Sequence, residues 1–152
     1  MTYDLTGKNI LVAGGGKNLG GLISRLAADA GANVAVHYNS DSSRAEAEET
    51  VAAVQERGRR AVLLSGDLTS PDAVAQLFSD ASTALGGIDV AVNTVGKVLR
   101  KPIVETTEAE YDSMFDINSK AAYFFIKEAG RNLNDNGKII TIVTALLAAF
   151  TD

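Results

Sequence analysis

Short apolar runs alternate with segments of helical periodicity along the whole chain. Five runs rich in valine, isoleucine, leucine and alanine are bounded by glycine or polar residues, and they predict strands over residues 8–13, 33–38, 60–65, 88–93 and 137–144. Between these runs, apolar residues recur every three or four positions, which predicts helices over residues 19–30, 39–56, 70–85 and 107–133. Strand and helix therefore alternate from one end of the chain to the other.

The five apolar runs are continuous rather than alternating, which is typical of strands that are buried on both faces. Such strands form a parallel sheet with right-handed crossovers and helices on both sides, so the sequence predicts a doubly wound α/β sheet. The usual strand order of such a sheet is 3-2-1-4-5. In this order the fifth strand is an apolar sheet edge. Ligands bind to such sheets at the carboxyl ends of the strands, where the sequence places Gly14, Asp67, Asn93 and Thr144.

The amino-acid composition excludes several kinds of protein and binding partner. The 152 residues fit a single domain, residues 1–152, and 46% hydrophobic residues exclude intrinsic disorder. A net charge of −5 without a basic cluster argues against a nucleic-acid partner. The chain has no cysteine and only one histidine, His37, so we expect no metal site. Its apolar stretches are too short to span a membrane and its start lacks the pattern of a secretory signal, so we expect a cytoplasmic protein without a membrane partner.

A glycine-rich segment, residues 13–20 with the sequence AGGGKNLG, lies between the first strand and the first helix. Glycines allow a positive φ and the close approach of a pyrophosphate, and the first turn of the helix offers backbone N–H groups and the positive end of its dipole. The strict G-x-G-x-x-G spacing is absent because residue 19 is leucine, and the P-loop pattern fails as well. A glycine-rich turn without a ligand is the alternative. The residues expected to bind phosphate are Gly14, Gly16, Lys17, Asn18, Leu19 and Gly20.

The loop matches the pattern Gly-x-x-x-Gly-x-Gly with Asn18 in place of the middle glycine, and asparagine tolerates the left-handed region better than most other residues. In this loop the chain resembles the short-chain dehydrogenase/reductase family, and matching positions then follow in order along almost the whole chain. The resemblance implies a Rossmann-like fold that binds NAD(P). The segment His-Tyr-Asn-Ser at residues 37–40 is similar to the 3-oxoacyl-acyl-carrier-protein reductase and polyhydroxynaphthalene reductase branches.

Further matching positions follow the third and fourth strands. The family has an aspartate and a small apolar residue that touch the adenine, and an Asn-Asn-Ala-Gly segment that lines the cofactor. Where the family has Asn-Asn-Ala-Gly, this chain has Asn-Thr-Val-Gly at residues 93–96, so two of these four residues depart from the pattern. A turn-capping aspartate and a plain strand-ending turn are the alternatives. By resemblance, the cofactor-binding residues here are Asp67, Leu68, Asn93, Val95 and Gly96.

Two positions match catalytic residues of the family. Asn118 falls in the long helix, which by resemblance it bends locally while holding a water of the proton relay, and an exposed polar side chain is the alternative. Thr144 stands where the family has a serine that hydrogen-bonds the substrate carbonyl, and a threonine hydroxyl makes the same bond with an added methyl group. His37 lies on the strand that leads to the cofactor's ribose, and we expect it to pack or hydrogen-bond rather than move protons.

The end of the second strand indicates which cofactor is bound. An acidic residue there binds a ribose 2′-hydroxyl, whereas basic and hydroxyl-bearing residues accommodate a 2′-phosphate. The chain has Tyr38, Asn39 and Ser40 at this place, no carboxylate before Asp41, and a cationic Lys17 in the glycine loop. The sequence therefore favours NADP(H) over NAD(H), with Asp41 as the residue that would reverse the preference.

The family's proton donor is a tyrosine four residues before a lysine, and the resemblance places this pair beyond residue 152. The chain contains the same spacing at Tyr123 and Lys127, but Tyr123 points about 140° away from Asn118 on the predicted helix. We therefore reject this pair, and we expect the aromatic residues 123–125 to pack against the sheet or a partner helix.

The resemblance implies an NAD(P)(H)-dependent oxidoreductase that reduces a ketone or oxidises a secondary alcohol. It also implies a small-molecule substrate and a homo-oligomer, a dimer or tetramer. Without the Tyr-x-x-x-Lys pair, residues 1–152 are expected to be the N-terminal, cofactor-binding part of a larger domain, truncated after the fifth strand and inactive alone. A non-catalytic nucleotide-binding or protein-interaction module is the alternative function.

Overall fold

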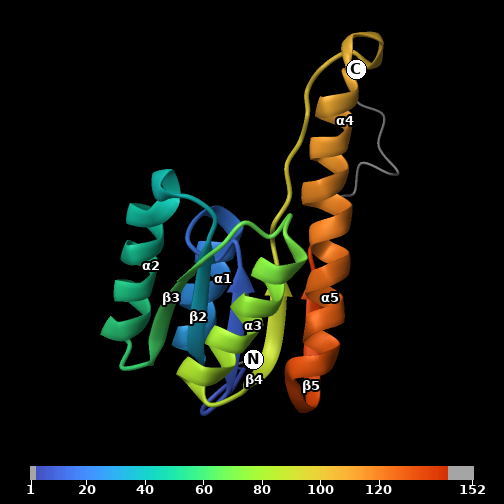
Figure 1. The fold of residues 1–152 in the computed structure, drawn as a ribbon. Coiled ribbons are helices and arrows are strands. Elements are labelled where there is room, and N and C mark those ends of the chain that lie inside the picture. The colour runs from blue at the N-terminus through green and yellow to red at the C-terminus, as the bar shows by residue number, and fades with distance from the viewer. Residues whose placement is uncertain (1–2, 144–152) are drawn as a thin grey trace.

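Five strands form a single parallel sheet in the order β3-β2-β1-β4-β5, in a computed structural model that describes residues 3–143 (Figure 1). This order and the parallel pairing confirm the predicted doubly wound sheet. The strands are β1 (Asn9–Ala13), β2 (Asn33–Tyr38), β3 (Ala61–Ser65), β4 (Ile88–Asn93) and β5 (Leu133–Thr141). The helices are α1 (Asn18–Asp29), α2 (Arg44–Glu56), α3 (Pro71–Leu85), α4 (Glu108–Phe115) and α5 (Ala121–Asn132), with short 3-10 turns at Asp41–Ser43 and Ile103–Glu105 and a π-helical turn at Asp116–Lys120.

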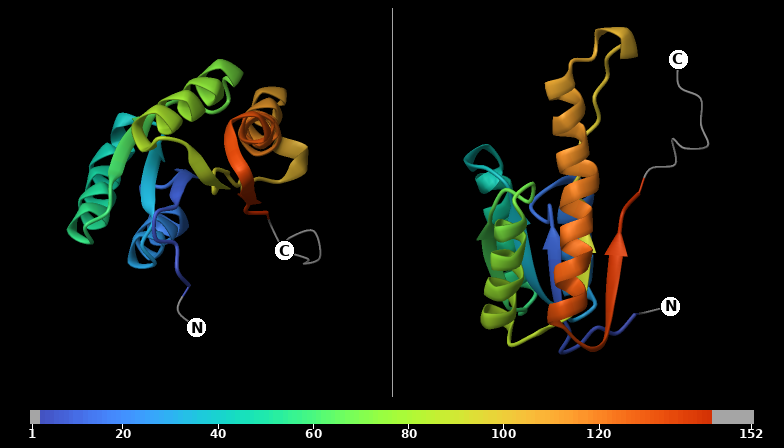
Figure 2. Two further views of the ribbon diagram at one scale, coloured as in Figure 1. Left: turned by 90° about the horizontal axis from the view of Figure 1, so that it is seen from below. Right: turned by 45° about the vertical axis from the view of Figure 1, so that its right-hand side comes forward.

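Two apolar layers cover opposite faces of the sheet, with α1 and α2 on one side and α3 and α5 on the other (Figure 2). Successive residues of a strand point to opposite faces. Ile10 and Val12 of β1 therefore pack with α1 and α2, whereas Leu11 and Ala13 pack with α3 and α5. All residues of β1 are buried, which is the physical reason for its continuous apolar run.

Strand β5 forms one edge of the sheet and pairs with β4. Its side chains Ile139 and Ile140 are 41% and 47% exposed, as expected for an apolar strand at a sheet edge. The strand spans Leu133–Thr141 rather than the predicted 137–144, because the chain passes directly from the end of α5 into the strand. The predicted catalytic residue Thr144 lies outside the described residues.

The helix predicted over residues 107–133 is interrupted, because the π-helical turn separates α4 from α5. Within this turn, Asn118 Nδ2 donates to the Met114 carbonyl at 3.0 Å. That carbonyl would accept from the backbone N–H of residue 118 in a regular α-helix, so the side chain competes with the helical pattern. The predicted long helix is present over residues 108–132, but the π-helical turn that contains Asn118 divides it into α4 and α5. The second helix also begins later than predicted, at Arg44, after a 3-10 turn.

The three aromatic residues of α5 have different environments. Phe125 is fully buried against Phe78 of α3, and Phe124 is half-buried against the same core. Tyr123 is 67% exposed and does not pack against the sheet, so of the two expected places, the sheet or a partner helix, the first is wrong for this residue. Each residue turns the side chain by about 100° around the helix axis, and Tyr123 therefore points away from the face that holds Phe125.

The start of α4 is fixed by a reciprocal cap. Thr107 Oγ1 accepts a hydrogen bond from the Glu110 N–H at 3.3 Å, and Glu110 Oε2 accepts one from the Thr107 N–H at 2.8 Å. Lys101 Nζ lies 2.9 Å from the same carboxylate. The hydrogen bond from the Thr107 backbone, followed by that from Lys101, lowers the pKa of Glu110 from 4.5 to about 2.

Acidification is expected to weaken this cap. A carboxyl group whose pKa is lower in the folded than in the unfolded chain stabilises the fold at pH values above its unfolded pKa. For Glu110 the unfolded pKa is 4.5, and the stabilisation is lost as the pH falls towards the folded pKa of about 2. The unfolding temperature of the wild type should therefore fall more steeply with acidification through this window than that of Glu110→Gln, which cannot titrate. Thermal unfolding followed by circular dichroism measures both curves. Equal acid sensitivity of the two proteins would contradict the prediction.

Candidate functional site

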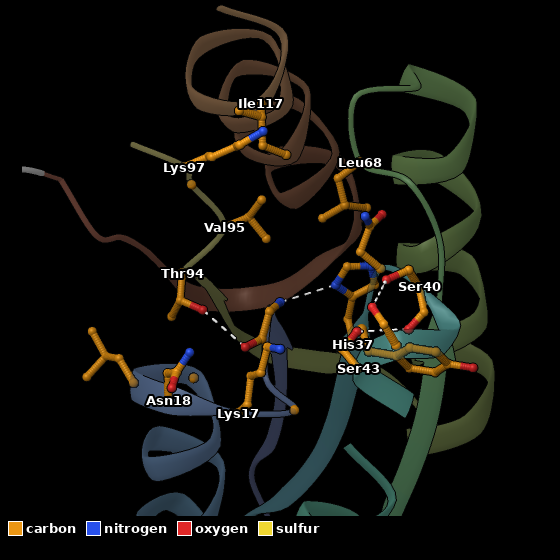
Figure 3. Close-up of a pocket in the computed structure, with 18 residues that line it drawn as sticks. Lys17, Asn18, His37, Ser40, Ser43, Leu68, Thr94, Val95, Lys97 and Ile117 are labelled. Carbon is orange, nitrogen blue, oxygen red and sulfur yellow. Dashed lines mark hydrogen bonds between the residues drawn. The ribbon is translucent and has the colours of Figure 1, made fainter. Parts of the chain in front are cut away.

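A cavity of about 810 Å³ lies at the carboxyl ends of β1, β2 and β4, the edge of the sheet where a ligand is predicted (Figure 3). Most of the residues predicted to bind the cofactor line it: Gly14, Gly16, Lys17, Asn18, Leu19, Gly20, Tyr38, Asn39, Ser40, Leu68, Val95 and Gly96. Residues that also line it but were not predicted as binding residues are His37, Ser42, Ser43, Thr94, Lys97 and Ile117. Strand ends and turns far apart in the sequence thus meet in one site.

The other predicted residues lie beside this cavity or outside the described chain. Asp67 lines an adjoining hollow of about 580 Å³, which shares Asn39, Lys97 and Ile117 with the main cavity. Asn93 is buried beneath the site, and its Oδ1 accepts a hydrogen bond from the Val95 N–H at 3.0 Å. Asn118 does not line the cavity but hydrogen-bonds the backbone of Lys97, which does.

The glycine turn after β1 has the conformation that a close backbone approach requires. Gly14 has a φ of 72° and Asn18 a φ of 48°, so both residues are in the left-handed region. Lys17 is the N-cap of α1, and its side chain makes no capping hydrogen bond. The N–H groups of the first turn of α1 therefore have no side-chain cap in the described structure, and helix starts of this kind bind anions.

The carbonyl groups of the turn are held by the two helices below it. Ser24 Oγ of α1 donates to the Gly15 carbonyl at 3.1 Å, and Thr50 Oγ1 of α2 donates to the Gly16 carbonyl at 2.7 Å. Arg25 in turn donates to Thr50 Oγ1 at 2.9 Å. The two buried hydrogen bonds from Ser24 and Thr50 fix the path of the turn.

His37 connects the glycine turn to the end of β3. Its Nδ1 lies 3.1 Å from the Gly14 N–H nitrogen, and its Nε2 lies 2.9 Å from the Gly66 carbonyl oxygen. The side chain is only 1% exposed, and this burial lowers its pKa below the usual 6.5. The expectation that His37 hydrogen-bonds is confirmed by these contacts. Its place in the cavity wall was not predicted.

Two contacts tie the segment after β4 to its neighbours. Thr94 Oγ1 donates to the Ala13 carbonyl at 2.8 Å, so this departure from the family pattern joins β4 to the glycine turn. Asn118 Oδ1 accepts from the Lys97 N–H at 2.9 Å, and its Nδ2 donates to the Lys97 carbonyl at 2.9 Å. Asn118 is exposed, as the alternative expects, but its side chain is paired with the backbone of Lys97. The π-helical turn fixes the wall of the cavity through Lys97.

Cations and hydroxyl groups dominate the polar lining of the cavity. Lys17 and Lys97 line it, and among the described residues no carboxylate does. Lys17 Nζ forms an exposed ion pair with Glu46 of α2 at 2.9 Å. Asp41, the residue considered able to reverse the cofactor preference, belongs to the 3-10 turn after β2 and is exposed.

These features define a Rossmann-like α/β protein with its binding cavity at the carboxyl edge of a parallel sheet. Residues 13–149 match the family model described as Enoyl-(Acyl carrier protein) reductase. The chain belongs to the short-chain dehydrogenase/reductase family.

Relatives with known names or structures agree with this assignment. A protein from Burkholderia cenocepacia, whose crystal structure contains bound NADP, is 58% identical with a TM-score of 0.95 over 99% of this chain and 57% of its own. A short-chain dehydrogenase from Oenococcus oeni PSU-1 is 46% identical with a TM-score of 0.83, over 97% of this chain and 64% of its own. Hydroxynaphthalene reductase-like protein Arp2 of Metarhizium robertsii is 37% identical over 90% of this chain. The chain spans 50% of that relative's length.

Two other features are absent from the part of the chain that the structure describes. Within residues 3–143, no three histidine, aspartate or glutamate side chains are grouped so that they could hold a metal ion. In the same part of the chain, no helix has both the length and the apolar character needed to cross a membrane.

Proposed function

We propose that this chain binds NADP(H) and forms the cofactor-binding part of an oxidoreductase that reduces a ketone or oxidises a secondary alcohol. The observation that carries the proposal is the cavity in which the glycine turn, the start of α1 and a set of hydroxyl and cationic side chains meet. The family and the NADP bound to the Burkholderia relative support the same type of cofactor. The substrate is a small carbonyl compound or alcohol, and the whole protein is a homo-oligomer.

The parts of the cavity suit different parts of a dinucleotide. The glycine turn and the first turn of α1 suit the pyrophosphate, because their backbone N–H groups and the helix dipole attract anions. Leu68 and Ile117 supply apolar surface of the kind that an adenine ring needs. Tyr38 and the serines that follow β2 supply hydroxyl groups near the expected ribose position.

The preference for NADP(H) over NAD(H) rests on the charge of this lining. Lys17 reaches the cavity together with Ser40, Ser42 and Ser43, all of which suit a 2′-phosphate. A carboxylate that would bind a ribose 2′-hydroxyl is absent from the described lining residues.

Removal of the Lys17 charge should therefore weaken NADP(H) binding selectively. For Lys17→Ala we expect the Kd for NADPH to rise about tenfold or more, because a charge-assisted hydrogen bond is worth roughly 1.5–3 kcal/mol. The Kd for NADH should change by less than about threefold, since NADH has no 2′-phosphate. Isothermal titration calorimetry with both cofactors measures the two values.

Lys8→Ala is the matched control, because Lys8 precedes β1 at the end of the sheet opposite the glycine turn and pairs with Asp89. It should leave both affinities unchanged. An equal loss for NADPH and NADH in Lys17→Ala would refute the role in selectivity. Tighter binding of NADH than NADPH, lost in Asp41→Asn, would instead establish NAD(H) as the cofactor.

The proposed reaction moves a hydride to the carbonyl carbon and a proton to its oxygen, or the reverse in oxidation. When bound, the dinucleotide supplies or accepts the hydride. Asn118 is proposed to hold a water of the proton relay, next to the Lys97 backbone that it already contacts. Thr144 is proposed to hydrogen-bond the substrate carbonyl through its hydroxyl.

The reading frame beyond Asp152 tests the catalytic part of the proposal. We expect it to encode a tyrosine and a lysine in Tyr-x-x-x-Lys spacing roughly a dozen residues after Thr144, since hydride transfer to a carbonyl requires a positioned proton donor. Intact-mass measurement of the expressed protein and oxidation of NADPH by simple ketones complete the test. A stop codon directly after Asp152, or cofactor binding without turnover by the complete protein, would leave a nucleotide-binding module without catalysis.

A further inference from the structure

The only histidine of the chain is held between two backbone groups whose hydrogen-bonding roles cannot change. The Gly14 N–H can only donate, so Nδ1 of His37 must present its lone pair to it at 3.1 Å. The Gly66 carbonyl can only accept, so Nε2 must carry the proton at 2.9 Å. A single state, the neutral imidazole protonated at Nε2, satisfies both contacts.

The contact at Gly14 matters because this residue is the first of the glycine turn. Its φ is 72°, and an added Cβ would lie 2.8 Å from Thr94 Oγ1. On the β4 side, Thr94 holds the carbonyl of Ala13 at 2.8 Å. On the β2 side, His37 accepts the Gly14 N–H (Figure 3). The turn is therefore hydrogen-bonded to residues that follow or belong to both neighbouring strands. His37 makes the hydrogen bond on the side of the expected ribose.

We propose that His37 is a positioning residue of the nucleotide site, which in its neutral Nε2–H form holds the glycine turn of β1 in register with the end of β3. This inference rests on the proposed binding of NADP(H) for its functional consequence. His37 needs no contact with the cofactor for this role. It acts through Gly14, whose amide direction sets where the turn and the start of α1 meet the pyrophosphate.

Protonation of the ring would oppose this role. An imidazolium carries a proton on Nδ1 and would face the Gly14 N–H donor with a second donor. Burial is the main cause of the lowered pKa, which keeps the ring neutral at pH values near 7. The ionisable side chains on the segments around the ring are Lys17 after β1, Tyr38 on β2, Asp67 and Asp72 after β3, and Lys97 after β4.

Three variants separate the two hydrogen bonds. His37→Asn retains an acceptor at the position of Nδ1, His37→Gln retains a donor near the position of Nε2, and His37→Leu removes both. We expect the Kd for NADPH to rise about tenfold or more in His37→Leu and His37→Gln, and to stay within about threefold of the wild type in His37→Asn. Unfolding temperatures of the same variants show whether each loss of NADPH affinity is explained by a loss of stability. Losses that track stability alone, without rescue by asparagine, would overturn the proposal.

The pH profile gives a readout that a packing role would not change. As the pH falls through the lowered pKa of His37, the wild type should lose NADPH affinity more steeply than His37→Asn. Titration of the cofactor's own phosphates is common to both proteins and cancels in the ratio. Parallel profiles for the two proteins would overturn the proposal.

NMR of the protein without cofactor tests the inference independently of the proposed function. Long-range proton–nitrogen spectra should show His37 as the Nε2–H tautomer, and the Gly14 amide resonance should shift in His37→Leu but much less in His37→Asn. An Nδ1–H tautomer or an imidazolium at neutral pH would refute the inference. If the wild type binds neither NADPH nor NADH, the proposed function fails while these spectra still decide the role of His37.

Discussion

Replacement of Gly20 by alanine is expected to abolish useful nucleotide binding. A Cβ on Gly20 would overlap the carbonyl oxygen of Gly14 and lie 2.8 Å from Thr94 Oγ1. The Gly14 carbonyl belongs to the backbone of a turn that is held by hydrogen bonds to His37 and Thr94. Displacement of this carbonyl by the new Cβ would therefore strain these hydrogen bonds. We expect the Kd for NADPH to rise about a hundredfold, which corresponds to roughly 2.7 kcal/mol. Overpacking should also lower the free energy of unfolding by about 1–3 kcal/mol.

Gly130→Ala is the matched control for this substitution. Gly130 lies within α5, and an added Cβ would meet no atom within 4 Å. Alanine is favoured over glycine inside a helix by roughly 0.5–1 kcal/mol, so this variant should be as stable as the wild type or more so. Calorimetric titration and urea unfolding measure both variants. Wild-type NADPH affinity in Gly20→Ala would contradict the close packing of the turn on the start of α1.

Truncation of Phe125 is expected to have the largest effect on stability. Phe125 is fully buried, and its ring centroid lies 5.0 Å from that of Phe78, so the pair joins α5 to α3 above the sheet. Phe125→Ala should lower the free energy of unfolding by about 3–5 kcal/mol, because it leaves a cavity in a close-packed core. This is a large part of the roughly 5–15 kcal/mol that stabilises a typical domain.

Phe115→Ala provides the comparison, because Phe115 is the same residue type in the adjoining helix and is 51% exposed. We expect it to cost about 1 kcal/mol or less. Urea unfolding monitored by circular dichroism yields both free energies. Similar costs for the two variants would mean that Phe125 is not the core contact between α5 and α3.

The buried parallel strands and the position of the site could be predicted from sequence because both depend on local patterns. Continuous apolar runs such as Ile10–Val12 occur where a strand is covered on both faces. The glycine turn is equally local, since a positive φ at Gly14 and Asn18 requires residues that tolerate it. A turn of this type between strand and helix fixes the carboxyl edge of the sheet as the place where a ligand binds.

Contacts between residues far apart in sequence could not be predicted in this way. The long helix contains a π-helical turn at Asn118, whose side chain is paired with the Lys97 backbone, 21 residues away. Helical periodicity contains no information about such a partner. In the sequence Thr94 is only a departure from the family pattern, because its acceptor on β1 is 81 residues distant.

The sequence by itself determined the parallel sheet, its helical layers, the glycine turn and the family, since burial, helix periodicity and tolerance of positive φ are properties of short segments. Only the tertiary structure decided the hydrogen-bond partners of single polar side chains. His37 reads in sequence as one histidine on an apolar strand, whereas in the fold it lies between Gly14 and Gly66, whose fixed donor and acceptor select one tautomer. Hydrogen-bond partners of buried polar groups are chosen by the folded geometry, because burial removes the water that would otherwise pair with them.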